Sequence, residues 1–102
     1  MSVNGFFQSA EQMFKALANS YRIQILTIVG SNKDMCAKEI ARELELSQPD
    51  VSYHLSKLRQ VGALEVRKEG TRHCYTLNRQ SLERVGIDPE QLLRYQEVNY
   101  SE

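Results

Sequence analysis

Residues 47–62 read SQPDVSYHLSKLRQVG, and their spacing is typical of one short helix with two different faces. Val51, Leu55 and Leu58 recur at the intervals of an apolar stripe, which a helix buries against the body of a protein. Ser47 can cap the first turn, and Pro49 falls inside that turn, where its missing N–H costs nothing. The stretch therefore predicts a helix with a defined start, held by one face and open on the other.

The open face of this helix carries hydroxyl, amide, aromatic and cationic side chains, with Asp50 as its only acid. Such a surface suits nucleic acid better than a metabolite. We expect Gln48, Ser52 and Tyr53 to meet base edges, and cations to meet phosphate. His54 lies between the buried and the open side, so we expect it to pack or to contact phosphate.

A second short helix is predicted over residues 37–44, AKEIAREL, with Ile40, Ala41 and Leu44 facing inward. A turn of a few residues joins it to the helix described above, and Gly62 follows that helix in a position suited to ending it. Two helices in this arrangement form a helix-turn-helix, here over about 37–61, whose second member enters a major groove.

Residues 63–77 predict a β-hairpin, because two alternating segments flank a turn at Gly70. We expect His73, Tyr75 and Leu77 to share one face, with His73 in the core, and Cys74 to lie exposed on the other. The tip gathers cations suited to a phosphate backbone or a minor groove. The predicted DNA contacts of helix and hairpin together are Ser47, Gln48, Asp50, Ser52, Tyr53, His54, Lys57, Arg59, Arg67, Lys68 and Arg72.

The charge distribution supports a polyanionic partner in spite of a formal net charge of zero. Residues 57–84 hold seven Lys or Arg against three Glu, whereas the segments on either side are acidic. A basic middle of this kind binds a polyanion locally, with modest non-specific affinity.

Both ends of the chain predict amphipathic helices, over about 6–18 and 88–98, with more large apolar groups than one small core needs. A first helix that is simply buried is one interpretation, and a homodimer interface built by the two ends is the other. The predicted interface residues are Phe6, Phe7, Met13, Phe14, Leu17, Leu92, Leu93 and Tyr95.

The composition fits one domain, residues 1–102, of a mainly helical protein with a small β-hairpin. With 41% apolar and 25% charged residues, no stretch approaches a membrane span, and no secretory signal is evident, so we expect a cytoplasmic protein. Enzymatic activity is not expected, because the sequence shows no phosphate-binding loop, nucleophile motif or carboxylate cluster.

The two cysteines, Cys36 and Cys74, have no spacing typical of a metal site or a disulfide framework. Two inert thiols are one interpretation, and redox control is the other, since Cys74 lies beside Arg72 and oxidation of either thiol would shift the hairpin or the helix-turn-helix. A disulfide needs Cα atoms within ~7 Å, and nothing in the sequence brings the two cysteines that close.

The order of these elements resembles the ArsR/SmtB family of winged helix-turn-helix transcriptional repressors. FKALANSYRIQIL is similar to the opening helices of the family, EIARELELSQPDVSYHLSKLRQVGAL to its helix-turn-helix, and RKEGTRHCYTL to its wing. The resemblance implies a homodimer, dimerising through its terminal helices, that binds an imperfect palindrome in an operator and represses transcription until a signal weakens binding.

The sequence departs from the family at the positions that sense metals. Where many members carry Cys-x-Cys, this chain has Cys36-Ala37-Lys38, and after Cys74 it contains no further His or Cys. Neither a thiolate nor an imidazole metal site can be assembled there, so we expect no metal and no cofactor. Regulation by thiol chemistry, by a partner protein or by abundance stays open, as does a winged-helix module that binds protein instead of DNA.

Overall fold

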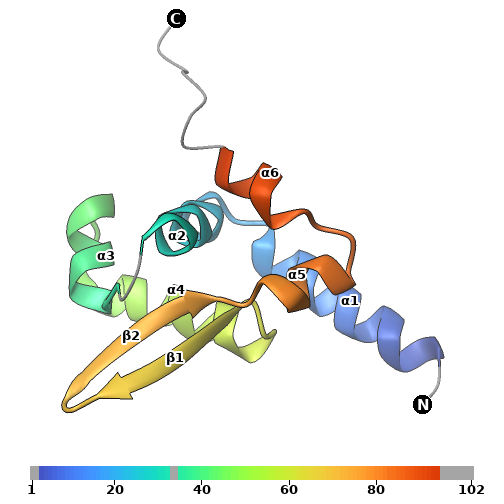
Figure 1. Cartoon of the computed structure of the whole chain (residues 1–102), viewed down its shortest axis with the longest axis horizontal. Coiled ribbons are helices and arrows are strands. Elements are labelled where there is room, and N and C mark those ends of the chain that lie inside the picture. Colours follow the sequence, from blue (N-terminus) through green and yellow to red (C-terminus); the bar gives the residue numbers. More distant parts are fainter. Residues whose placement is uncertain (1–2, 33–34, 95–102) are drawn as a thin grey trace, which may run out of the picture.

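The computed structural model describes residues 3–32 and 35–94. The chain order is α1 (Val3–Leu17), α2 (Ser20–Ser31), α3 (Ala37–Leu44), α4 (Gln48–Gln60), β1 (Leu64–Glu69), β2 (Arg72–Leu77), α5 (Arg79–Arg84) and α6 (Pro89–Leu93). Figure 1 shows the helices gathered into one body from which the two-stranded hairpin projects. The predicted fold, mainly helical with a small hairpin, is confirmed as a winged helix-turn-helix.

The helix boundaries follow from local capping groups. The Ser47 hydroxyl accepts a hydrogen bond from the Asp50 N–H at 3.1 Å, which fixes the start of α4 where the sequence predicts it. Gly62 follows that helix with φ +82°, a conformation that a residue with a Cβ rarely adopts. The chain can therefore reverse sharply from α4 into β1.

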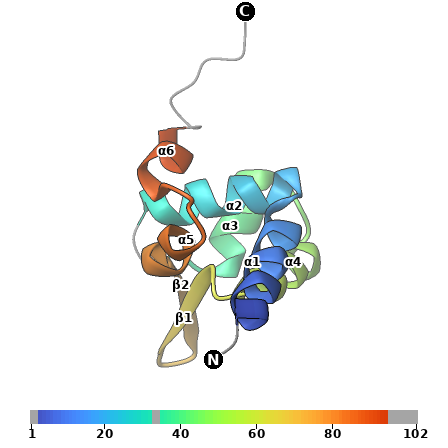
Figure 2. The same ribbon diagram turned by 90° about the vertical axis from the view of Figure 1, so that its right-hand side faces the viewer.

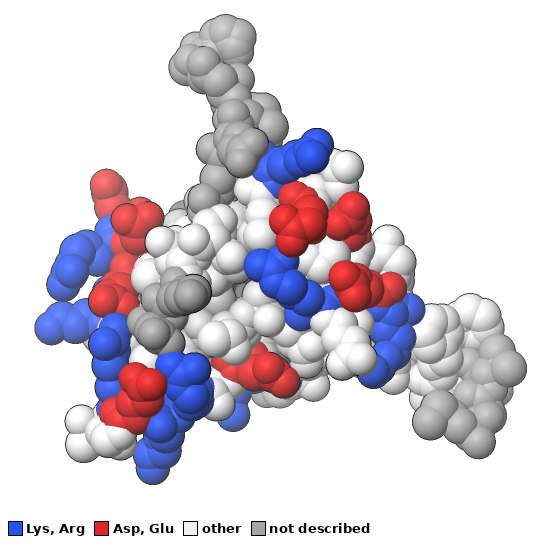
Figure 3. Space-filling model, viewed as in Figure 1, with Lys and Arg blue, Asp and Glu red and all other residues white. Residues whose placement is uncertain are grey.

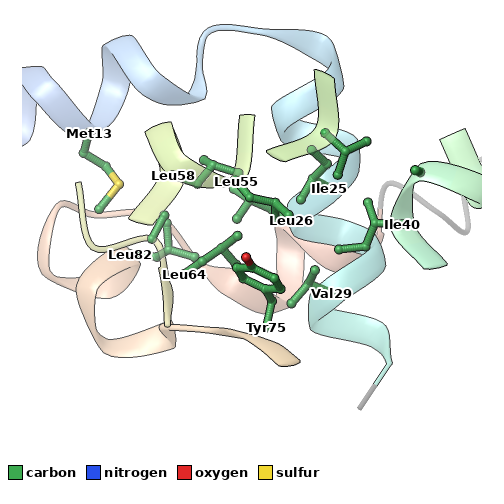
Figure 4. Close-up of a cluster of buried hydrophobic side chains, with 13 residues drawn as sticks. Met13, Ile25, Leu26, Val29, Ile40, Leu55, Leu58, Leu64, Tyr75 and Leu82 are labelled. Atoms are coloured by element: carbon green, nitrogen blue, oxygen red, sulfur yellow. The ribbon is translucent and has the colours of Figure 1, made fainter. Parts of the chain in front are cut away.

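The core lies between α2, the inner face of α4 and the base of the hairpin. Ile25 and Leu26 of α2 are fully buried, and Leu55 and Leu58 of α4 point toward them, as Figure 4 shows. The predicted stripe of α4 is thus the face that packs inward. This packing fixes the opposite face of α4 outward.

The hairpin is antiparallel and runs in register from the Leu64–Leu77 pair to the Glu69–Arg72 pair. A second contact extends it: Met35, just before α3, forms an isolated antiparallel bridge with Tyr75. The Tyr75 N–H donates a hydrogen bond to the Met35 carbonyl at 2.8 Å. The start of α3 therefore lies against β2, a proximity that the sequence did not predict.

Two predictions for β2 are wrong. His73 is exposed, whereas Cys74 is fully buried, with a relative exposure of 0%. The simple alternation fails because α3 packs against one side of β2 and the main core against the other, so that Cys74 and Tyr75 are both covered. His73 lies closer to the tip of the hairpin, among exposed neighbours.

The first helix presents both a buried and an exposed apolar face. Phe6, Phe7 and Phe14 are 41%, 62% and 50% exposed. The first part of α1 extends beyond the body in Figure 1 and lies in front of it in Figure 2. Met13, predicted at a subunit interface, is instead 3% exposed, because its side chain fills the core of its own chain. Leu17 is half-buried against the same core.

The C-terminal helix is docked onto the body. Leu92 packs against the core, and Leu93 lies over Gly30 of α2, where an added Cβ would stand 2.5 Å from the Leu93 side chain. Tyr95 and the rest of the predicted helix over 88–98 lie outside the described residues.

Candidate nucleic-acid interface

The first two turns of α4 present the predicted DNA-reading side chains to solvent. Ser47, Gln48, Asp50 and Ser52 are all exposed, and Tyr53 is 55% exposed. Their exposure follows directly from the burial of the opposite stripe. A helix held in this way offers one polar face to a groove.

Tyr53 is flanked by two cations. The guanidinium carbon of Arg22 lies 5.8 Å from the centre of the Tyr53 ring, and the Lys57 ammonium nitrogen lies 5.4 Å from it. Both separations fall in the range of cation–π attraction. This arrangement restricts the side chain of Tyr53 while leaving more than half of its surface accessible.

His54 joins α4 to α2 through the same arginine. Arg22 Nε donates to His54 Nδ1 at 3.0 Å, and Arg22 Nη1 donates to the Ala16 carbonyl at 3.3 Å. Because Nδ1 accepts a hydrogen bond, the imidazole is neutral. Burial, and then the positive charge of Arg22, lowers the pKa of His54, while Asp50 opposes this shift.

The tip of the hairpin carries the predicted cations Arg67, Lys68 and Arg72, all exposed. Figure 3 shows Lys and Arg side chains gathered over the hairpin together with acidic neighbours. Arg67 pairs with Glu69 at 3.0 Å, and Arg72 pairs with Glu39 of α3 at 3.0 Å. Both pairs are accessible to solvent, where an ion pair contributes little to stability.

Glu39 is the residue that ties the wing to the helix-turn-helix. Its carboxylate accepts from the Cys36 N–H at 2.9 Å and from Arg72 Nη2 at 3.0 Å. The hydrogen bond from Cys36 and, to a smaller extent, the charge of Arg72 hold the pKa of Glu39 below its ordinary value. Arg72 is thereby oriented from the side of α3.

A hollow of about 310 Å³ separates the recognition helix from the wing. It brings together the predicted contacts Gln48 and Ser52 of α4 with Arg72 of β2, and Cys36 also lines it. Lys57 and Arg59 lie further along α4, the former half-buried and the latter exposed. Three of the predicted contacts, from α4 and from the hairpin, therefore lie around one hollow.

Arg22 and Glu39 were missed by sequence reasoning. Arg22 precedes Ile25, Leu26 and Val29 by three, four and seven residues, so it is a charged residue on the buried stripe of its helix. That position could have indicated a polar partner in the sequence, since a cation on a buried face requires one. Glu39 occupies the position of a capping-box acid, although the hydroxyl that usually accompanies it is replaced by Cys36.

Within residues 3–32 and 35–94, no three His, Cys, Asp or Glu side chains come together in a way that would hold a metal ion. The same part of the chain contains no helix that is both long and apolar enough to cross a membrane.

Comparison with known proteins connects this surface to a family. Residues 19–66, which contain α2, the helix-turn-helix and the start of the wing, match the model of the bacterial regulatory proteins of the arsR family. An uncharacterised HTH-type transcriptional regulator of Methanocaldococcus jannaschii is 38% identical over 69 residues, or 68% of this chain and 78% of that protein. The chain belongs to the ArsR family.

Solved structures agree with this family assignment. HlyU from Vibrio cholerae has a TM-score of 0.71 at 32% identity, and the match covers 100% of both chains. A winged helix-turn-helix DNA-binding domain from Mycobacterium bovis, described as homodimeric, has a TM-score of 0.74 at 26% identity over 95% of this chain and 85% of that one.

Curated relatives in the ArsR family include proteins with opposite effects on transcription. The arsenical resistance operon repressor of Escherichia coli is 36% identical over 66% of this chain and 57% of that protein, and the transcriptional activator HlyU is 41% identical over 65% and 60%. The chain spans little more than half the length of these two relatives. It is a transcriptional regulator with a DNA-binding helix-turn-helix, and not an enzyme.

Proposed function

We propose that this ArsR-family protein is a homodimeric repressor that binds a palindromic operator and needs no metal to do so. The observation that carries the proposal is the hollow that Gln48 and Ser52, on the exposed face of α4, share with Arg72 of the hairpin. We infer that α4 enters a major groove with Gln48, Ser52 and Tyr53 toward the bases. The wing cations then lie along phosphates beside it.

Dimerisation is proposed from the apolar surface of α1. Phe6, Phe7 and Phe14 together leave three large rings open to solvent, an arrangement that is unfavourable unless another surface covers them. The relative from Mycobacterium bovis is described as homodimeric, which supports the same assembly here. Two copies would place their recognition helices ~34–36 Å apart, one turn of DNA, so that each reads half of a palindrome.

Binding is tested by selecting sequences from a random DNA pool and titrating the selected duplex at two salt concentrations. We expect a palindromic consensus and an affinity that falls steeply with salt, because cations displace counterions from phosphate. If no sequence is enriched and the affinity for DNA hardly depends on salt, a protein-interaction module is the better interpretation. The direction of regulation is tested with a reporter gene placed behind the operator in cells. If the protein is a repressor, deleting its gene raises expression of the reporter.

A further inference from the structure

Cys36 and Cys74 each lie next to a residue of the contact between the start of α3 and β2. Met35 and Tyr75 form an antiparallel bridge, closed by the 2.8 Å hydrogen bond from the Tyr75 N–H to the Met35 carbonyl. In antiparallel pairing, the residue after one partner lies opposite the residue before the other, which places Cys36 opposite Cys74. The backbone of Cys36 is extended, with φ −102° and ψ 167°, as this pairing requires.

The pairing sets the distance between the two cysteines. Met35 and Tyr75 occupy the hydrogen-bonded position of an isolated bridge, and the chain enters α3 directly after Cys36. If the pairing is continued by one residue, standard antiparallel geometry puts the Cα atoms of Cys36 and Cys74 ~4.5 Å apart, with both side chains on the same face. Disulfides span Cα separations of ~4.4–6.8 Å. We infer from this geometry that the two residues can form a disulfide without a rearrangement of the fold.

Both cysteine side chains act on Arg72. The pKa of its guanidinium is raised, first by Glu39 and then by the side chains of Cys36 and Cys74. One guanidinium therefore lies close to both cysteine side chains. The chain contains only these two cysteines, so any disulfide within one chain must join them.

We propose that Cys36 and Cys74 form a disulfide within one chain when the protein meets a hydroperoxide. Cys36 is half-buried and lines the 310 Å³ hollow, so its thiolate is the accessible nucleophile. Its Sγ attacks the outer peroxide oxygen, the O–O bond breaks, and an alcohol or water leaves. Cys36 is then a sulfenic acid.

The buried Cys74 completes the reaction as the resolving thiol. Its Sγ attacks the sulfur of the Cys36 sulfenic acid, the S–S bond forms, and the S–O bond breaks with loss of water that carries away the proton of Cys74. Together the two thiols give up two electrons, and these reduce one peroxide. The burial of Cys74 protects it from direct attack and favours this order.

The disulfide also affects DNA binding, a step that rests on the proposed function. Cys36 shares its hollow with Gln48 and Ser52 of α4 and with Arg72 of the wing. A covalent bond from Cys36 to Cys74 takes the Cys36 sulfur away from its interaction with Arg72, so that the Arg72 side chain shifts relative to Gln48 while the backbone stays in place. Loss of one well-placed contact in each half-site predicts an affinity about tenfold or more lower.

The disulfide itself is tested on the full chain without DNA. The wild type, Cys36→Ser and Cys74→Ser are treated with hydrogen peroxide, alkylated, and examined by intact mass and non-reducing electrophoresis. We expect both thiols of the wild type to become resistant to alkylation without any covalent link between chains. A reductant should restore both thiols. Cys74→Ser should stop at a sulfenic acid on Cys36 that a 1,3-diketone traps, and Cys36→Ser should stay reduced.

Two results would contradict the proposed disulfide. In one, both thiols of the wild type can still be alkylated after treatment with peroxide; in the other, peroxide produces a covalent dimer in place of the bond within one chain. The DNA effect is measured separately, by titrating the selected duplex with reduced and oxidised wild type and with Cys36→Ser/Cys74→Ser, whose affinity should not respond to peroxide. Equal affinities of the oxidised and reduced wild type contradict the regulatory step. If the reduced protein binds no duplex, the proposed function is contradicted, but the mass measurement still decides whether the disulfide forms.

Discussion

Gln48 stands at the start of the recognition helix, exposed and beside the wing. We predict that Gln48→Ala weakens operator binding by about 1–3 kcal/mol and relaxes the preference at one base pair per half-site, because a bidentate amide contact is lost. Competition titrations against duplexes with single base changes measure both effects. Gln91→Ala, which removes an exposed amide from α6, is the matched control and should change neither. Unaltered preference in Gln48→Ala would show that this amide reads no base.

His54 gives the stability of the protein a specific dependence on pH. Its pKa is lowered in the folded state by burial and by Arg22, so the unfolded chain takes up a proton more readily than the folded chain does. The stabilisation is therefore present above the ordinary histidine pKa of ~6.5 and is lost as the pH falls through the lower folded value.

We predict that the free energy of unfolding rises with pH across that window and rises less in His54→Gln. Urea titrations on both sides of the window measure the difference. His73→Gln, which changes the exposed histidine of the wing, should keep the dependence of the wild type. An identical pH dependence in His54→Gln and wild type would mean that the Arg22–His54 contact does not favour the neutral imidazole.

At the level of the elements, the proposed function assigns charge to the wing and sequence preference to α4. We predict that Arg72→Ala weakens binding to specific and random duplexes alike and flattens the dependence of affinity on salt, because one phosphate contact per protomer is lost. Arg79→Ala is the matched control, since it removes an arginine that is likewise paired with a glutamate, Glu90 at 2.7 Å, but lies on α5. An effect of Arg72→Ala confined to one sequence would instead assign Arg72 to base reading.

The docking of α6 depends on the lack of a side chain at Gly30. A Cβ at this position would stand 2.5 Å from Leu93 and 3.0 Å from Leu77. We predict that Gly30→Val destabilises the fold by about 1–3 kcal/mol through overpacking, and that Gly30→Val/Leu93→Ala recovers part of the loss. Denaturant titration gives both numbers. Ser31→Val, at the exposed neighbouring position, should be nearly neutral, and an equal cost at both positions would exclude overpacking as the cause.

The elements that the sequence predicted best are those specified by local interactions. In α4, the capping serine, the proline and the apolar stripe all lie within one helix, so the pattern alone determines both its start and its open face. In β2, burial is determined by α3, and the bridge that joins them connects Met35 to Tyr75. A single bridge between distant residues produces no periodic pattern in the sequence. The exposure of His73 and Cys74 was therefore predicted wrongly.

For the whole molecule, the exposed rings of α1 predict how two copies meet. We predict that Phe7→Glu/Phe14→Glu converts a dimer into a monomer at micromolar concentration and weakens binding to the palindrome, while the helical content is retained. Analytical ultracentrifugation and circular dichroism separate these effects. Gln8→Glu/Gln12→Glu adds the same charge at exposed positions of the same helix and should remain dimeric. A wild type that sediments as a monomer yet binds the palindrome tightly would contradict this assembly.

The hydrogen bond between Tyr75 and Met35 closes the chain into a loop that contains α3, α4, β1 and most of β2. The entropic cost of closing a loop of this size rises only slowly with its length, and a few contacts at its base determine how often it opens. Hydrogen exchange at the Tyr75 amide therefore reports the opening of this loop. If Tyr75 exchanges faster than the amides of Ile25 and Leu26 in α2, the contact between the start of α3 and β2 opens while the core stays folded. The free energy of this local opening can then be measured without unfolding the protein.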